Sequence, residues 1–223
     1  MVVKNRLNAR DNPLAAYALK TNRTTVDSSP YLSYPLHEEE LAKYADGCVV
    51  IVVANEAATK KVINQRVWIL GAGFANDSPT IESRCWGHAE YARFAAQSAF
   101  REAGIKSIDE IDFFEVDDSY AYKELQHLIA LGLYDEPVEA GRAVESGETR
   151  RDGKTPVNVS GGALGMKCFS RLCATNESEG RQTISPPNVK DSTYSPAFAT
   201  IISAAVYGSV FLLAMLCTHC SIS

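Results

Sequence analysis

An unbroken apolar run, CVVIVVA at Cys48–Ala54, places the strongest constraint on the fold. It is rich in β-branched residues, with Asp46-Gly47 before it and Asn55 after it. A strand that is apolar on both faces needs a covering layer on each side, as the central strands of α/β proteins have. RVWILGAGFAN, at Arg66–Asn76, predicts a second strand of this kind.

Two segments carry the periodicity of amphipathic helices. In His88–Gly104 the apolar residues recur at i, i+3, i+4 and i+7, and Gly104 is placed to end the helix in a left-handed conformation. Ala121–Leu133 predicts a second helix. Ile111–Asp118 and Pro156–Gly162 predict a strand flanked by acids and a short strand with a turn. This order of strands and helices predicts α/β layers.

The composition of the sequence changes after Gly165. Residues 167–194 are polar and predict a linker, and residues 195–223 form an apolar tail. Within the tail, Ala197–Cys217 carries no charge and is long enough to cross a bilayer as a helix, so it is a candidate transmembrane helix. Two alternatives stay open: the run is a buried helix of a larger assembly, or the tail is not a selected sequence at all. The abrupt change at Lys167 favours the latter.

Charge and cysteine usage restrict the partners and the compartment. The net charge of −5 argues against nucleic acid, which needs clustered Lys and Arg. The six cysteines form no tight framework and predict reduced thiols in a cytoplasmic body, with membrane association through the tail as the open alternative. The CxxC at Cys217–Cys220 lacks a second pair at suitable spacing, so no metal site is predicted.

Three blocks, in this order and spacing, carry a family resemblance. They are Asn12–Glu56, Glu110–Leu133 and Pro156–Met166. Together they resemble the later part of a thiolase-superfamily protein, in particular a sterol-carrier-type or archaeal-type acetyl-CoA acetyltransferase. The resemblance covers residues 1–166. It implies an incomplete thiolase-like C-terminal half, with a mixed sheet covered by helices, followed by a tail foreign to the family.

The resemblance also implies a chemistry. Members of the family condense or cleave acyl-CoA thioesters: a cysteine in the first half takes the acyl group, and the second half supplies oxyanion donors and a base. Coenzyme A thioester is then the substrate, and no bound cofactor is expected. Expected partners are acyl-CoA and thiolase-type subunits in a homo- or hetero-oligomer.

One candidate catalytic residue follows from this comparison. Asp117, in EVDDSY, takes the first position of the family's strand-end motif, which holds a water or the thioester oxygen. An ionised aspartate has no proton to donate, so Asp117 would hold a water, or be protonated if buried beside Asp118. The alternative is that Asp117 and Asp118 cap the helix that begins near Ala121.

A glycine turn supplies the candidate substrate-binding residues. Asn158, Gly161 and Gly162 match the family's Asn-x-x-Gly-Gly motif and predict close approach of a ligand to the backbone. Where that motif continues with glycine and the catalytic histidine, this chain has Lys167 and Cys168.

No clear nucleophile or replacement base accompanies that turn. Cys85, beside Arg84 and before a helix N-terminus, is a candidate thiolate. His127 is expected to be an ordinary packed or half-exposed histidine. These residues predict a thiolase-type acyltransferase domain that is weak or inactive alone, or else a non-catalytic acyl-CoA-binding or scaffold subunit with or without a membrane anchor.

Overall fold

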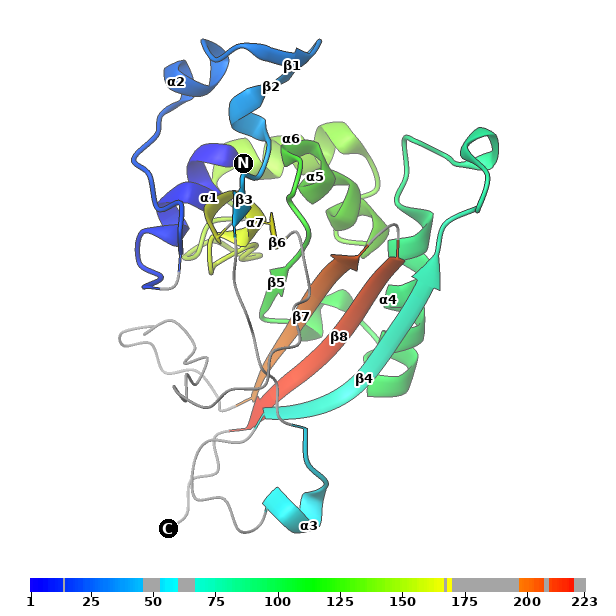
Figure 1. The fold of residues 1–223 in the computed structure, drawn as a ribbon. Coiled ribbons are helices and arrows are strands. Elements are labelled where there is room, and N and C mark those ends of the chain that lie inside the picture. The colour runs from blue at the N-terminus through cyan, green and yellow to red at the C-terminus, as the bar shows by residue number, and fades with distance from the viewer. Residues whose placement is uncertain are drawn as a thin grey trace.

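The computed structural model describes residues 1–13, 15–45, 53–59, 67–166, 168–169, 197–206 and 209–218, the last three ranges and the edges of some others for the backbone alone. Most of the strand predicted over Cys48–Ala54 lies outside these residues, as does the linker predicted over 167–194 except for residues 168–169. The described chain forms an N-terminal lobe and a body of helices beside a sheet (Figure 1).

Short elements make up the N-terminal lobe. The helices α1 and α2 come first, and Asn22 caps α2 by accepting a hydrogen bond from the Thr25 N–H at 2.8 Å. The antiparallel pair β1 and β2 follows. The elements of this stretch of the chain are α1 (Val2–Ala9), α2 (Arg23–Asp27), β1 (Tyr31–Ser33), β2 (Leu36–His37), η1 (Glu38–Glu40), β3 (Tyr44–Ala45) and α3 (Glu56–Thr59). Of these, α3 lies apart from the lobe, near the start of β4 (Figure 1).

The body contains the predicted strand–helix–strand–helix order. The helix expected over His88–Gly104 is α4, and Gly104 ends it with φ 74°, as predicted. The elements are β4 (Val67–Asn76), η2 (Ile81–Ser83), α4 (Glu90–Ala103), η3 (Ile108–Glu110), β5 (Phe113–Glu115), α5 (Ala121–Ala130), α6 (Pro137–Ser146), α7 (Gly162–Met166), β6 (Cys168–Phe169), β7 (Ala197–Val206) and β8 (Ser209–Thr218).

The main sheet is mixed and runs in the order β4-β8-β7-β5. β8 is antiparallel to both β4 and β7, whereas β5 and β7 are parallel. Helix α4 packs along β4, and α5 and α6 lie beyond β5 (Figure 1). This mixed sheet with covering helices confirms the predicted fold class.

The C-terminal tail differs from the helix that its hydropathy predicts. Residues of the charge-free run form β7 and β8, an antiparallel pair inserted between β4 and β5 (Figure 1). A continuous apolar run fits a strand covered on both faces as well as a buried helix, and the gap between β4 and β5 supplies backbone partners for strands. Within the described residues, no helix has the length and apolarity needed to cross a membrane.

Close approach of α4 to β4 depends on two glycines. A Cβ at Gly73 would lie 1.7 Å from the Ala95 carbonyl oxygen, and one at Gly71 would lie 2.4 Å from that of Ala99. The predicted alanine face of α4 is buried on this side. The core it enters consists of Ala95, Ala96, Ala99, Ile111, Phe114, Val116, Leu128, Leu131 and Val157.

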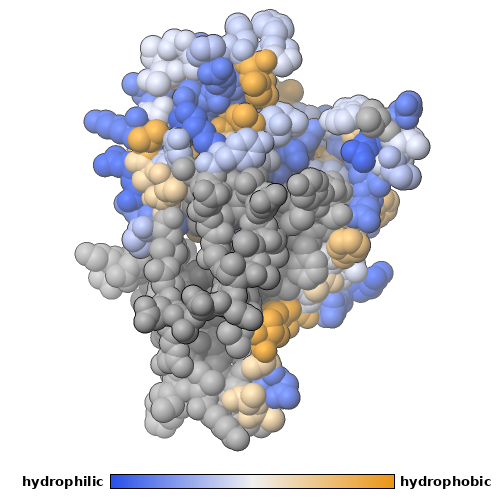
Figure 2. Space-filling view, in the orientation of Figure 1, coloured by the Kyte–Doolittle hydropathy of each residue, from blue (hydrophilic) through white to orange (hydrophobic). Residues whose placement is uncertain are grey.

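Apolar residues also reach the surface. On the face drawn in Figure 2, the described hydrophobic residues lie in separate patches among polar ones. On β4, Ile69 is 42% exposed and Phe74 is 61% exposed. The sheet therefore keeps apolar side chains exposed on the side of β4 that faces away from α4.

We predict that Gly73→Ala destabilises the fold by roughly 3 kcal/mol, because a methyl group there must push α4 away from β4. The measurement is the free energy of unfolding in urea. Gly87→Ala is the matched control, since a Cβ at Gly87 meets nothing within 4 Å. Equal stability of the two variants would contradict the close packing described above.

Candidate functional site

The candidate site lies where the chain leaves the carboxyl end of β5, a position at which α/β sheets commonly bind ligands. Two consecutive acids, Asp117 and Asp118, follow this end. In the extended segment before α5, their side chains go to opposite sides. Asp118 contacts the start of α7, whereas Asp117 contacts Lys123 of α5.

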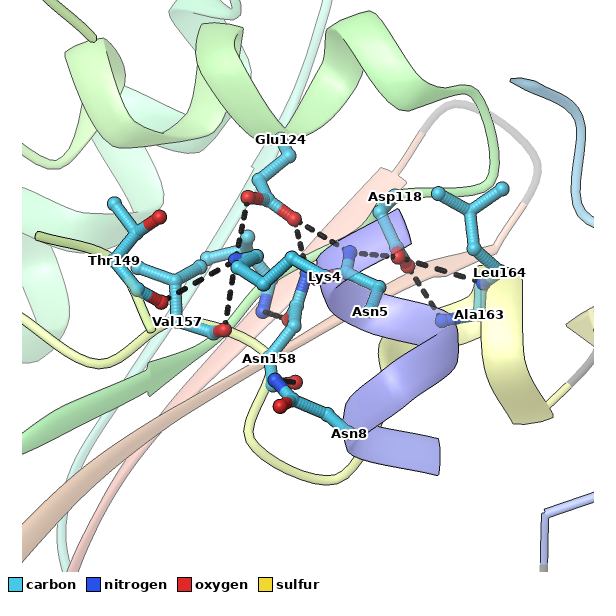
Figure 3. A network of polar contacts seen from close by, with 11 residues as sticks. Lys4, Asn5, Asn8, Asp118, Glu124, Thr149, Val157, Asn158, Ala163 and Leu164 are labelled. Carbon is cyan, nitrogen blue, oxygen red and sulfur yellow. Dashed lines mark hydrogen bonds and ion pairs between the residues drawn. The ribbon is translucent and has the colours of Figure 1, made fainter. Parts of the chain in front are cut away.

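Asp118 caps α7. Its carboxylate is fully buried and accepts hydrogen bonds from the N–H groups of Ala163 and Leu164, the latter at 3.4 Å (Figure 3). The alternative that Asp117 and Asp118 cap the helix near Ala121 is wrong: the N-cap of α5 is Tyr120, without a side-chain hydrogen bond. Asp118 faces a different helix because the strand end and the glycine turn lie side by side.

A network of buried polar residues surrounds Asp118. The Asn5 amide donates to Asp118 Oδ2 and to Glu124 Oε2, both at 2.6 Å, and Lys4 Nζ donates to Glu124 Oε1 at 2.8 Å. The Asn158 amide donates to Glu124 Oε2 at 2.9 Å. We call Lys4, Asn5, Asp118, Glu124 and Asn158 the buried network (Figure 3). It joins α1, the end of β5, α5 and the turn before α7.

The charges of the buried network nearly cancel. Burial favours the neutral form of Glu124, but the Lys4 ammonium outweighs it and lowers the pKa of that carboxyl. For Asp118, burial and the negative charge of Glu124 together raise the pKa to about 8. At pH 7 the network therefore contains one ammonium, one carboxylate and one protonated acid.

The Asn158 side chain forms its hydrogen bonds within the protein. It is fully buried, its Oδ1 accepts the Val116 N–H at 2.8 Å, and its Nδ2 donates to Glu124. Its backbone N–H donates to the Phe114 carbonyl at 2.8 Å, so Asn158 ties the turn to β5. Its backbone carbonyl accepts the Asn8 amide at 2.9 Å and the Gly161 N–H at 3.0 Å. The predicted contact of Asn158 with substrate stays a prediction.

The two glycines behind Asn158 are required by the turn. Gly161 has φ 109° and Gly162 has φ 58°, where side chains are disfavoured. A Cβ at Gly161 would lie 2.6 Å from Ala9 Cβ, and one at Gly162 would lie 2.3 Å from Asp118 Oδ2. The turn thus packs directly on α1 and on the capping carboxylate. Its predicted role in substrate binding remains untested.

A second polar group lies on the other side of the strand end. Asp117 Oδ2 pairs with Lys123 Nζ at 3.2 Å, and Asp117 Oδ1 accepts the Ser119 N–H at 2.9 Å. Tyr91 Oη of α4 lies 3.5 Å from Nε2 of His127 of α5. We call Tyr91, Asp117, Lys123 and His127 the Asp117 cluster.

The Asp117 cluster contains one ion pair and two neutral rings at pH 7. Burial opposes ionisation of Asp117, but Lys123 and the Ser119 N–H outweigh it and lower the pKa, so the protonated aspartate that the sequence allowed for is disfavoured. Burial lowers the pKa of His127 to about 4 and raises the pKa of Tyr91. His127 is 1% exposed, in keeping with the expected packed histidine.

Cys85 is an exposed free thiol. Its neighbour Arg84 donates through Nε to the Ser78 carbonyl at 2.8 Å, and α4 begins only at Glu90. A catalytic role of Cys85 remains untested. Among the described residues, no group of His, Cys, Asp and Glu is arranged to hold a metal ion.

An open groove of about 470 Å³ is found elsewhere. It lies between Met1, α5 and α6, and contains none of the predicted site residues. Its lining is Met1, Leu125, Val138, Gly141, Arg142, Val144 and Glu145.

Sequence reasoning missed Lys4, Asn5 and Glu124. Glu124 had a signal: with 3.6 residues per turn, it lies near Ala121 and Leu128 on the inward face of α5, where an acid needs a partner. Lys4 and Asn5 had none, because the α1 segment shows no pattern that separates buried polar residues from exposed ones.

Comparison with known proteins gives one family and several relatives. The family described as thiolase C-terminal domain-like matches residues 73–170. An acetyl-CoA acetyltransferase of Methanothermobacter thermautotrophicus is 29% identical over 165 residues, which are 72% of this chain and 42% of that protein. The benzoylsuccinyl-CoA thiolase subunit BbsB of Thauera aromatica is 26% identical over 74% of this chain and 42% of its own length. Sterol carrier protein 2 of Bos taurus is 26% identical over 72% of this chain and 30% of its own length.

Solved structures share the fold. An Ltp2-ChsH2(DUF35) aldolase matches with a TM-score of 0.70 at 18% identity, covering 96% of this chain and 56% of that one. A monomeric SCP2-thiolase-like protein of Mycobacterium smegmatis matches with a TM-score of 0.60 at 12% identity, covering 99% and 45%. The chain thus spans less than half the length of the curated relatives it matches.

We predict that Lys4→Met destabilises the protein by about 3 kcal/mol at pH 7, because it leaves the buried Glu124 carboxylate without a cation. Urea unfolding measures this. Adding Glu124→Gln to the same variant should restore part of the loss. Lys43→Met, at a pair in which the lysine is 40% exposed, is the control and should cost less than about 1 kcal/mol. No recovery in the double variant would show that charge is not the cause.

We predict that stability falls as pH rises through the pKa of Asp118. The folded protein holds a proton on this acid up to about pH 8, whereas the unfolded chain releases it near the ordinary aspartate pKa of 3.8. The folded state therefore binds more protons over this range, and stability is lost as pH rises. Melting temperatures at pH 6.5 and pH 9 measure this, and Asp118→Asn should flatten the difference. Asp152→Asn, at an exposed position, should leave it unchanged.

Proposed function

We propose that this chain acts on acyl-CoA thioesters as the second half of a thiolase-type acyltransferase. The match of residues 73–170 to the thiolase C-terminal domain-like family supports this proposal. Coenzyme A thioester is the substrate, and the chemistry needs no bound metal or cofactor. The relatives named for acetyl-CoA and benzoylsuccinyl-CoA point to the same class of substrate.

One observation carries the proposal: the glycine turn and the end of β5 form a single preorganised unit. Asp118 holds the start of α7, and Asn158 holds the backbone of Val116. Oxyanion stabilisation needs donors fixed before the reaction, and the family resemblance supports a thioester site at this turn. The buried network supplies that rigidity without presenting its own side chains to the ligand.

We further propose that the chain is weak or inactive alone. Acyl transfer needs a thiolate nucleophile and a base of suitable pKa. The motif histidine position holds Cys168, and Cys85 is an exposed thiol. The nucleophile then comes from another thiolase-type subunit, in a homo- or hetero-oligomer. The exposed Ile69 and Phe74 on β4 favour such association.

A second candidate function is a non-catalytic acyl-CoA-binding or scaffold subunit. The ionised, paired Asp117 favours it, because that side chain cannot donate to an oxyanion. The relative named as a thiolase subunit and the structural neighbour named as a complex of Ltp2 with ChsH2 are proteins that work alongside others. The two candidates share the binding step and differ in turnover once a complete thiolase subunit is present.

We expect the purified chain to bind acetyl-CoA in titration calorimetry and to exchange its acetyl group at no more than the background rate. Gly162→Ala should weaken binding, because its Cβ meets the Asp118 carboxylate. Gly132→Ala is the matched control: it has a similar φ of 82°, but its Cβ meets nothing within 4 Å. Absence of binding would overturn the proposed substrate class. Exchange that Cys85→Ala abolishes would overturn the inactivity of the isolated chain.

A further inference from the structure

The Asp117–Lys123 ion pair occupies the place where the proposed chemistry needs a donor. We propose that the Lys123 ammonium is the hydrogen-bond donor to the thioester carbonyl oxygen of the bound acyl-CoA, with Asp117 as its positioning residue. This inference rests on the proposed function and adds a residue that the family motif does not contain.

Two elements place Lys123. Asp117 lies in the segment that follows β5, Lys123 lies in the first turn of α5, and Asp117 Oδ2 and Lys123 Nζ are 3.2 Å apart. The Lys123 side chain is 24% exposed, whereas that of Asp117 is 9% exposed. The ammonium therefore lies at the rim of the strand end, and the carboxylate behind it fixes its position.

The hydrogen-bonding capacity of Lys123 is only partly used. An ammonium carries three N–H donors. Among the residues that the structure describes, Asp117 is its hydrogen-bond acceptor. Two N–H donors are thus left for a ligand. By contrast, the amide of Asn158 has both of its polar atoms occupied.

The charge state also suits the role. Burial alone would lower the pKa of Lys123, but the Asp117 carboxylate outweighs it and raises that pKa, so the ammonium persists at neutral pH. Charge-assisted hydrogen bonds to a developing oxyanion are about twice as strong as neutral ones. A cation beside an ionised aspartate thereby supplies what the aspartate itself cannot.

Tyr91 is a second neighbour that acts on the charge of Lys123. Its hydroxyl lies 3.5 Å from His127 Nε2, and burial raises the pKa of Tyr91, so the phenol keeps its proton. His127 is buried, and burial lowers its pKa to about 4, so its ring is neutral at pH 7. We assign His127 no contact with substrate: it supports the Tyr91 ring, which it meets edge-on with centroids 6.1 Å apart.

The test compares two ligands that differ in the carbonyl group: acetyl-CoA and S-ethyl-CoA, a thioether without that oxygen. In calorimetric titrations, Lys123→Met should weaken acetyl-CoA binding about tenfold or more, the range for a lost charge-assisted hydrogen bond. Binding of S-ethyl-CoA should change little. Lys123→Arg should recover part of the loss, and Lys154→Met, at an exposed loop position, should leave both affinities unchanged.

Infrared difference spectra of acetyl-CoA labelled with ¹³C at the carbonyl give an independent signature. A hydrogen bond from Lys123 lowers the carbonyl stretching frequency of the bound ligand, and Lys123→Met should remove that shift. Equal weakening of both ligands, or an unchanged frequency in Lys123→Met, would overturn the role of Lys123 and leave the proposed function standing. Binding of neither ligand by the unaltered chain would overturn the proposed function, and this inference with it.

Discussion

The buried carboxylate of Glu124 is the interaction on which the rest of the site depends. It is fully buried and accepts hydrogen bonds from Lys4, Asn5 and Asn158, which come from α1 and from the turn before α7. A buried acid that lost these partners would be strongly destabilising, so the fold is held to one arrangement of α1, α5 and the turn. Burial, together with the negative charge of Glu124, raises the pKa of Asp118, so Asp118 keeps its proton at neutral pH.

That arrangement divides two neighbouring acids between two tasks. Asp118 points inward and holds the start of α7, whereas Asp117 points toward α5 and holds Lys123. Because successive residues of an extended segment face opposite sides, one strand end serves both the fold and the proposed chemistry.

Local patterns predicted much of the fold. The alanine spacing of α4, the glycine that ends it and the strand over Arg66–Asn76 are set by neighbours in sequence, and the structure contains all three. The site was less accessible. Lys4 and Glu124 are 120 residues apart, and nothing in either segment specifies that they meet. The apolar tail has no period that separates helix from strand, so only its neighbours β4 and β5 determine that it forms β7 and β8.

The strand-end position illustrates how a lost donor can be compensated. An isolated aspartate at residue 117 would repel a developing oxyanion, since an ionised carboxylate only accepts hydrogen bonds. Lys123 reverses that effect: it cancels the charge of Asp117 and extends its own N–H groups past it toward solvent. Residue 117 alone therefore suggests a negative charge where the pair is neutral. The pair, rather than the single position, is the unit that determines what this end of the sheet can bind.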